Sequence, residues 1–216
     1  MHDARISPAS TVQAADSLPP ITKDQQVRKL VSHLLLTLDG IAVFNTAVVG
    51  EIMKLRDDEV EADFFKHLAD EDAMLLGRVT YAEWAGFWPT SATLPFALHI
   101  NGVPKYVASS TLSAAPWGGQ THASLLQGDL AIAVPKLKAM SGKNIGVHGS
   151  PTLVESLLHD NLLDELRLEI YPVIAGNGVP FFRGAREVKK MDLVRSKVAA
   201  NGVAILTYRP TAAPLP

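Results

Sequence analysis

Three segments of the chain place glycine and hydroxyl side chains directly after an apolar run, an arrangement suited to holding phosphate. The first is IGVHGSPTL, residues 145–153, in which Gly149 ends the apolar run. Ser150 is a good N-cap residue, and Pro151 suits the first position of a helix. Glycine lets a ligand approach the backbone closely, and the N-terminus of a helix attracts anions. The segment therefore predicts an anion site or, alternatively, a helix start that binds nothing.

The second segment, LLGRVTY at residues 75–81, repeats the order of apolar run, glycine and helix start. Arg78 is able to form a bidentate pair with a phosphate. A structural alternative is open here too, because Thr80 and Glu83 have the spacing of a capping box.

The third segment is Ser109-Ser110, which follows a short apolar strand at residues 105–108. These hydroxyls either hydrogen-bond a phosphate or begin a turn. In open α/β sheets, ligands bind at the carboxyl ends of the strands. Three such segments in one chain indicate converging phosphate sites, which suggests a dinucleotide.

Two further features are candidates for contact with a substrate. Asp39 is the one acid placed directly after a long apolar run. Burial there would raise the pKa of its carboxyl and let it donate or orient a proton. Alternatively, Asp39 and Gly40 only form a turn. Trp84 and Trp88 either line a slot for a flat heterocycle or belong to the core.

The elements that must position these residues alternate between strand and helix patterns. Apolar runs predict strands over 29–38, 73–76, 105–108 and 144–148, and apolar–polar alternation predicts a strand over 165–171. Helical periodicity predicts helices over 57–69, from about 80, over 129–140 and over 151–160. Asn201-Gly202 predicts a hairpin that joins 193–199 to 203–209. This order predicts a three-layer α/β/α domain with a mixed, mostly parallel sheet and a C-terminal antiparallel hairpin.

The strand at 165–171 alternates apolar and polar side chains, so Arg167, Glu169 and Tyr171 share one face. We expect this polar face and the terminal hairpin to be available to a second copy of the chain. One domain is expected over residues 27–210. Residues 1–26 and 211–216 lack periodicity, and we predict a flexible arm and a flexible tail there.

Composition and charge argue against several classes of function. The 216-residue chain has a formal net charge of −2 and no long basic run, so nucleic acid is not an expected partner. It contains no cysteine, and its seven histidines lack chelating spacing, so we expect no metal site. No apolar stretch approaches the roughly 20 residues of a membrane span. A cytoplasmic location without a signal peptide is expected.

Six motifs occur in order along the chain: TLDG at 37–40, LGRVTYAE at 76–83, KYVASSTL at 105–112, VHGSPTL at 147–153, LDELRL at 163–168 and PVIAGNG at 172–178. The ordered set resembles the dihydrofolate-reductase-like proteins that share the reductase domain of bifunctional riboflavin biosynthesis enzymes. The resemblance covers residues 28 to about 209. It implies a dihydrofolate-reductase-like fold, an NADPH cofactor, hydride transfer and a homodimer.

The resemblance also implies roles for individual residues. It assigns to the cofactor Gly77, Arg78, Thr80, Ser109, Gly149, Ser150, Thr152 and Leu153, and we add Ser110 and Pro151 from the same turns. It places Asp39 at the substrate, and we add Phe44, Trp84 and Trp88 as further candidates for substrate contact. Asp39 would face the nicotinamide and act as the catalytic residue.

One departure from the family concerns the substrate. Riboflavin-pathway reductases carry a lysine just after the Asp-Gly pair, whereas this chain has the apolar segment 41–44. Their substrate bears a ribose phosphate and needs cationic partners, so we predict a different small heterocycle, reduced at a C=N or C=C bond. One alternative is a true riboflavin-pathway 5-amino-6-(5-phosphoribosylamino)uracil reductase or a dihydrofolate reductase. Another is a non-catalytic nucleotide-binding protein on the same fold.

Overall fold

The computed structural model describes residues 28–43, 45–91, 94–119, 123–183 and 188–211, and a sheet of eight strands dominates them. The order of its strands is β5-β4-β3-β6-β1-β7-β10-β9. Their bounds are β1 Leu30–Thr37, β3 Glu71–Gly77, β4 Lys105–Ala108, β5 Ala123–Leu126, β6 Asn144–His148, β7 Glu165–Tyr171, β9 Met191–Val198 and β10 Ala204–Pro210. The six strands from β5 to β7 pair in parallel, and β10 pairs antiparallel with both β7 and β9. The predicted mixed sheet with a C-terminal antiparallel hairpin is confirmed.

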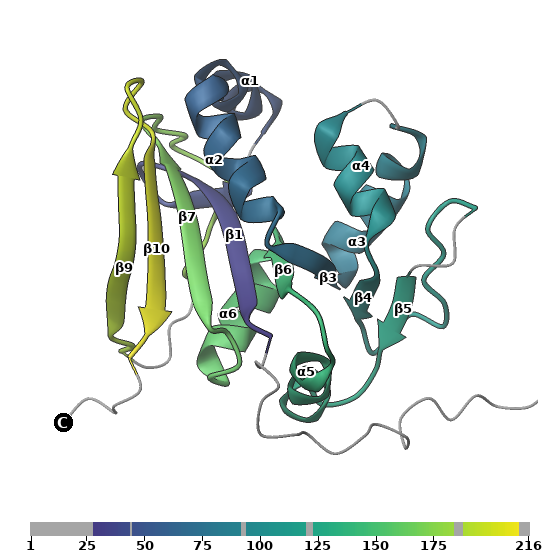
Figure 1. Ribbon diagram of the computed structural model, residues 1–216. Coiled ribbons are helices and arrows are strands. Elements are labelled where there is room, and N and C mark those ends of the chain that lie inside the picture. The colour runs from purple at the N-terminus through teal and green to yellow at the C-terminus, as the bar shows by residue number, and fades with distance from the viewer. Residues whose placement is uncertain (1–27, 44, 92–93, 120–122, 184–187, 212–216) are drawn as a thin grey trace, which may run out of the picture.

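Helices cover the sheet on both faces, which confirms the predicted three layers (Figure 1). One face carries α1 Thr46–Leu55, α2 Asp58–Leu68, α3 Arg78–Ala85 and α4 Pro95–Gly102. The other carries α5 Leu130–Ala139 and α6 Pro151–His159. A small second sheet pairs β2 Ile41–Val43 with β8 Val179–Pro180. Within the described ranges, no helix is long and apolar enough to cross a membrane.

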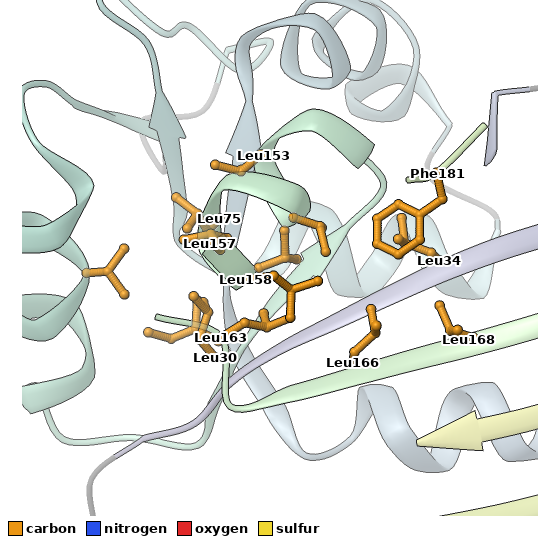
Figure 2. Close-up of a cluster of buried hydrophobic side chains, with 14 of the residues drawn as sticks. Leu30, Leu34, Leu75, Leu153, Leu157, Leu158, Leu163, Leu166, Leu168 and Phe181 are labelled. Atoms are coloured by element: carbon orange, nitrogen blue, oxygen red, sulfur yellow. The ribbon is translucent and has the colours of Figure 1, made fainter. Parts of the chain in front are cut away.

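The larger core lies between the sheet and helices α5 and α6 (Figure 2). Strand β1 sends Leu30, Leu34 and Leu36 into it, as the period of two requires. Helix α6 contributes Leu153 and Leu157 to the same core, and these two residues lie on one face of that helix. Because β1 is central and buried on both faces, its apolar run is nearly continuous, as predicted.

The polar face of β7 is not available to a partner, so that prediction is wrong. Arg167, Glu169 and Tyr171 are 3%, 0% and 0% exposed. Strand β7 lies between β1 and β10, and helices α1 and α2 cover this face. The polar side chains are tolerated there because each finds a charged or hydrogen-bonding partner inside the protein.

Gly146, in the middle of β6, makes room for one of these buried groups. A Cβ at this position would overlap the Glu71 carboxylate and lie 2.8 Å from His148 Nε2. Glu71 is 3% exposed and reaches across the strand to His148, 2.6 Å away. The absence of a side chain at position 146 is therefore what lets a carboxylate lie against the sheet.

We predict that Gly146→Ala destabilises the fold by about 3 kcal/mol, because overpacking here also displaces a buried charge from its partner. Urea unfolding would measure this loss. Gly50→Ala is the matched control, since Gly50 lies inside α1 and a Cβ added there would have nothing within 4 Å. That control should stabilise the protein by about 1 kcal/mol. Equal effects of the two substitutions would refute this view of Gly146.

Candidate functional site

The residues expected to bind a ligand meet along one edge of the sheet. Ser109 follows β4, Gly77 ends β3, Gly149 follows β6 and Asp39 follows β1. These four strands are neighbours and parallel, so their carboxyl ends lie in a row. With about 4.8 Å between strands, the row extends for about 14 Å, enough for an elongated ligand.

Ser150 joins two of these turns, which its expected role as a helix cap did not foresee. Its Oγ accepts a hydrogen bond from the backbone N–H of Gly77 at 3.0 Å and donates one to Thr80 Oγ1 at 2.6 Å. It occupies the N-cap position of α6 but makes no side-chain capping bond. The reason is its left-handed backbone, with φ 53° and ψ 63°, whereas a capping serine is extended.

The capping box expected at Thr80 and Glu83 is also absent. Helix α3 begins two residues earlier, at Arg78, and Gly77 is its N-cap residue. Thr80 therefore lies inside the first turn of the helix, where it is 8% exposed. An ideal Cβ on Gly149 would lie only 3.8 Å from Thr80 Oγ1, so the two predicted phosphate turns are in contact.

Two helix starts and one arginine supply positive potential at this place. Pro151 begins α6, so the N–H groups of Thr152 and Leu153 have no acceptor within the helix. The Leu153 side chain is buried in the core, and only its backbone can face a ligand. Arg78 is exposed at the start of α3, and no ion pair of its guanidinium is found in the described part of the chain.

Ser109 and Ser110 favour the turn interpretation. Ser109 Oγ accepts hydrogen bonds from the N–H groups of Thr111 and Leu112, at 3.2 and 3.1 Å. Ser110 is exposed. The Ser109 hydroxyl proton is not used in those two bonds, so a role in binding stays a prediction.

Asp39 does not have the raised pKa expected from its sequence position. It is exposed, and hydrogen bonds from Thr37 Oγ1, at 2.6 Å, and from the N–H groups of Ala175 and Gly176 lower the pKa of its carboxyl to about 2. Each of these donors stabilises the ionised form. Asp39 is therefore a carboxylate at neutral pH and fastens the loop after β7 to the end of β1.

The aromatic residues assigned to the substrate behave as parts of a core. Trp84 and Trp88 are partly buried, and both rings contact Phe96, at 5.7 and 5.0 Å between centroids. Phe96 in turn contacts His148, the last residue of β6. Phe44 lies outside the described residues. Phe96 therefore packs against both of the tryptophan rings that were expected to line a slot.

A layer of buried charged and polar side chains between the sheet and helices α1 and α2 was not predicted. Its members, called here the buried ionic layer, are His33, Arg56, Asp63, His67, Glu71, His148, Arg167, Glu169 and Tyr171. Arg195, which is exposed on β9, also pairs with Asp63. A histidine inside the apolar run of β1 and three polar residues on one face of β7 were its signals in the sequence. Within the described ranges, no group of three or more side chains is placed to hold a metal ion.

Glu71, one of the buried carboxylates of this layer, has partners from both a helix and the sheet. Glu71 lies 3.2 Å from His67 of α2 and 2.6 Å from His148 of β6. Burial by itself raises the pKa of the Glu71 carboxyl. The two imidazoles lower this pKa by more than burial raises it, and the result is a pKa of about 2. His148 directly precedes Gly149, so this cluster ends at the start of a predicted cofactor turn.

The second cluster surrounds Glu169, which is 2.9 Å from His33 Nε2 and 3.1 Å from Arg56. Tyr171 donates a hydrogen bond to the same carboxylate at 2.9 Å. Burial lowers the pKa of His33 to about 4, against the opposing effect of Glu169. His33 is therefore a neutral imidazole at pH 7 and lies beside an ionised glutamate.

The chain matches a protein family model and individual known proteins. A family model described as the RibD C-terminal domain matches residues 28–205. YyaP, an uncharacterized protein of Bacillus subtilis (strain 168), is 27% identical over 194 residues, which are 87% of this chain and 98% of YyaP.

Two solved structures share the fold at low sequence identity. One is a protein of Shewanella sp. PV-4 assigned to riboflavin biosynthesis, with 20% identity, a TM-score of 0.65 and coverage of 85% of this chain and 99% of that one. The other is dihydrofolate reductase of Enterococcus faecalis in complex with NADP(H), with 14% identity, a TM-score of 0.50 and coverage of 84% and 96%. The expected dihydrofolate-reductase-like fold is confirmed.

We predict that Asp39 titrates with a pKa of about 2 and that Thr37→Val raises this pKa, because the first and largest stabilising donor is then lost. Carboxyl-carbon NMR of Asp39 across acidic pH would measure both values. Asp58, an exposed residue in the first turn of α2, serves as the reference signal that Thr37→Val leaves unchanged. A pKa of Asp39 near 4 in the unaltered protein would contradict the hydrogen-bonding described here.

A further prediction concerns His33, whose pKa falls from 6.5 to about 4 on folding. The unfolded chain then binds a proton that the folded chain does not, so stability present at pH 7.5 is lost as the pH falls below 6.5. The loss from this residue should be about 1 kcal/mol between pH 7.5 and pH 5.5. Urea unfolding at both values should show that His33→Gln removes this dependence, whereas His159→Gln, at an exposed site, retains it.

Proposed function

The chain belongs to the RibD C-terminal domain family, and from that premise we propose that it is a reductase of the riboflavin-pathway type. In this proposal it takes NADPH as cofactor and transfers a hydride to a C=N or C=C bond of a small heterocyclic substrate. The observation that carries the proposal is the row of turns after β4, β3, β6 and β1 at one edge of the sheet. A homodimer, expected from the resemblance, stays a prediction.

The donors in this row fit a dinucleotide. Arg78 and the first N–H groups of α3 and α6 offer positive potential to phosphates at two adjacent strand ends. The hydroxyls of Thr80 and Ser109 are near the same edge. We assign Arg78 to the 2′-phosphate that distinguishes NADPH from NADH, because a guanidinium binds phosphate with paired hydrogen bonds.

The chain's own contribution to the chemistry is orientation. A bound nicotinamide supplies a hydride at its C4 atom, and the protein must hold the substrate against it. Asp39 suits that task, since its Oδ2 accepts one hydrogen bond from Gly176 and has a lone pair left for a substrate N–H. With a pKa of about 2, Asp39 is not the acid at neutral pH, and we assign the proton to water.

The residue after Asp39-Gly40 supports a substrate without a ribose phosphate. Ile41 starts β2, pairs with Pro180 and is 8% exposed. Its side chain is therefore a buried apolar group where the resembling reductases place a lysine. The site favours a neutral heterocycle that offers N–H donors to Asp39 over an anionic one.

We predict that NADPH binds the protein and that Arg78→Gln raises its Kd at least about tenfold while changing the Kd for NADH little. Fluorescence titration with each nucleotide would measure this. Lys136→Gln, at an exposed position on α5, is the charge-matched control and should leave both values unchanged. If neither NADPH fluorescence nor the melting temperature changes on mixing, the proposal of a reductase fails.

The substrate class is decided by turnover of NADPH with a panel of compounds. Neutral C=N and C=C heterocycles are expected to be reduced. Turnover of dihydrofolate or of the phosphoribosylamino pyrimidine above about 1 s⁻¹ would instead assign one of the known reductions. Binding of NADPH without turnover of any compound would favour a nucleotide-binding protein.

A further inference from the structure

The turns after β3 and β6 are held together by one hydroxyl. Ser150 Oγ accepts from the Gly77 N–H at 3.0 Å and donates to Thr80 Oγ1 at 2.6 Å. A serine hydroxyl has a single proton, and here that proton is used within the protein. Ser150 is thus committed to bonds with the neighbouring turn and has no proton for a phosphate.

We propose that Ser150 is a positioning residue, a clamp that makes one binding site out of two separate turns, and not itself a phosphate ligand. The proposal rests on the proposed function in so far as that site takes NADPH. Thr80 is the hydroxyl left with a free proton, because it accepts the bond from Ser150. Ser150 acts by setting where Thr80 and the Gly77 N–H lie.

The backbone of Ser150 has an unfavourable conformation, so the bonds of the clamp must offset a cost in free energy. Ser150 and Asn161 are the two described residues other than glycine with positive φ. Asparagine tolerates the left-handed region, whereas for serine it is unfavourable. The two hydrogen bonds of Oγ offset that cost and keep the residue where it can reach β3.

Gly77 is shaped for the same contact. Its φ of −78° and ψ of 156° suit any residue, so its conformation does not require glycine. A Cβ at position 77 would, however, lie 2.7 Å from Ser150 Oγ and 3.1 Å from Ser150 Cβ. Glycine is needed here because the clamp approaches so closely, and Gly77→Ala should push the hydroxyl away without straining the backbone.

Three variants and one control test the clamp through the Kd for NADPH, measured by fluorescence. Ser150→Ala and Gly77→Ala should each raise the Kd about tenfold, the effect of losing about one good hydrogen bond. Ser150→Gly removes both the hydroxyl and the strain, and it should bind as weakly as Ser150→Ala. Ser156→Ala is the control, because among the described residues the Ser156 hydroxyl bonds within α6, to the carbonyl of Thr152.

The double variant Ser150→Ala with Gly77→Ala tests whether the two residues act through one contact. If both residues act through one clamp, the double variant should lose about tenfold, as each single variant does. A loss of about a hundredfold, the product of two independent effects, would overturn the proposal. Wild-type affinity of Ser150→Gly would also overturn it, since the turn conformation alone would then be sufficient.

Hydrogen exchange of the Gly77 amide tests the clamp without any nucleotide. In the unaltered protein this N–H is bonded to Ser150 Oγ, so it should exchange at least about ten times more slowly than in Ser150→Ala. The amide of Val60, bonded to Asp57 Oδ1 at the start of α2, is the internal reference and should be unchanged. Equal exchange of Gly77 in both proteins refutes the clamp. Failure of the unaltered protein to bind NADPH refutes only the proposed cofactor.

Discussion

The need to pair buried carboxylates constrains how helices α1 and α2 lie on the sheet. A buried charge without a partner costs several kcal/mol. Three acids in the buried ionic layer, Asp63, Glu71 and Glu169, are at most 7% exposed. Asp63 of α2 pairs with Arg167 and Arg195 of the sheet, and Glu71 of the sheet pairs with His67 of α2. A shift of α2 by one turn would separate Asp63 from both arginines and leave Glu71 with His148 alone, so the layer fixes the position of the helix more sharply than apolar packing alone would.

The same pairing extends to the edge where the ligand is expected. His148 holds Glu71 and is followed directly by Gly149, whose N–H donates to the carbonyl of His33 at 3.3 Å. His33 in turn contacts Glu169. The turn after β6 is therefore fixed by the contact of His148 with Glu71, by the hydrogen bond from Gly149 to His33, and by the bonds of Ser150 to the turn after β3. A site for phosphates benefits from such fixed donors, because little ordering remains to oppose binding.

Local pattern in the sequence predicted the strands with continuous apolar runs, the hairpin and the edge of the sheet where the site lies. Helix α1 was missed because apolar residues such as Val49 and Met53 lie on its exposed side and blur the periodicity. The polar face of β7 was misjudged because alternation shows which residues share a face, whereas only tertiary pairing decides whether that face meets water or α2. The bonds that Ser150 makes, and those of Asp39 with Ala175 and Gly176, join segments 70 residues or more apart, and no local rule reports them. Together with the local hydrogen bond from Thr37, which has the largest effect, the bonds from Ala175 and Gly176 lower the pKa of Asp39 where burial was expected to raise it. The bonds of Ser150 replace a helix cap with a bridge between turns.

The two ends of the row consequently differ in what they can select. At the end near β3 and β6, helix starts and Arg78 provide fixed positive potential, which suits phosphate whatever the rest of the ligand. At the end near β1, Asp39 is a carboxylate that can only accept hydrogen bonds, and Ile41 beside it is apolar and buried. An anionic group would meet repulsion there, and a neutral ring with N–H donors would meet a fixed acceptor. The charge pattern of this one edge would therefore orient the proposed dinucleotide with its phosphates away from Asp39 and would leave Asp39 to the proposed substrate.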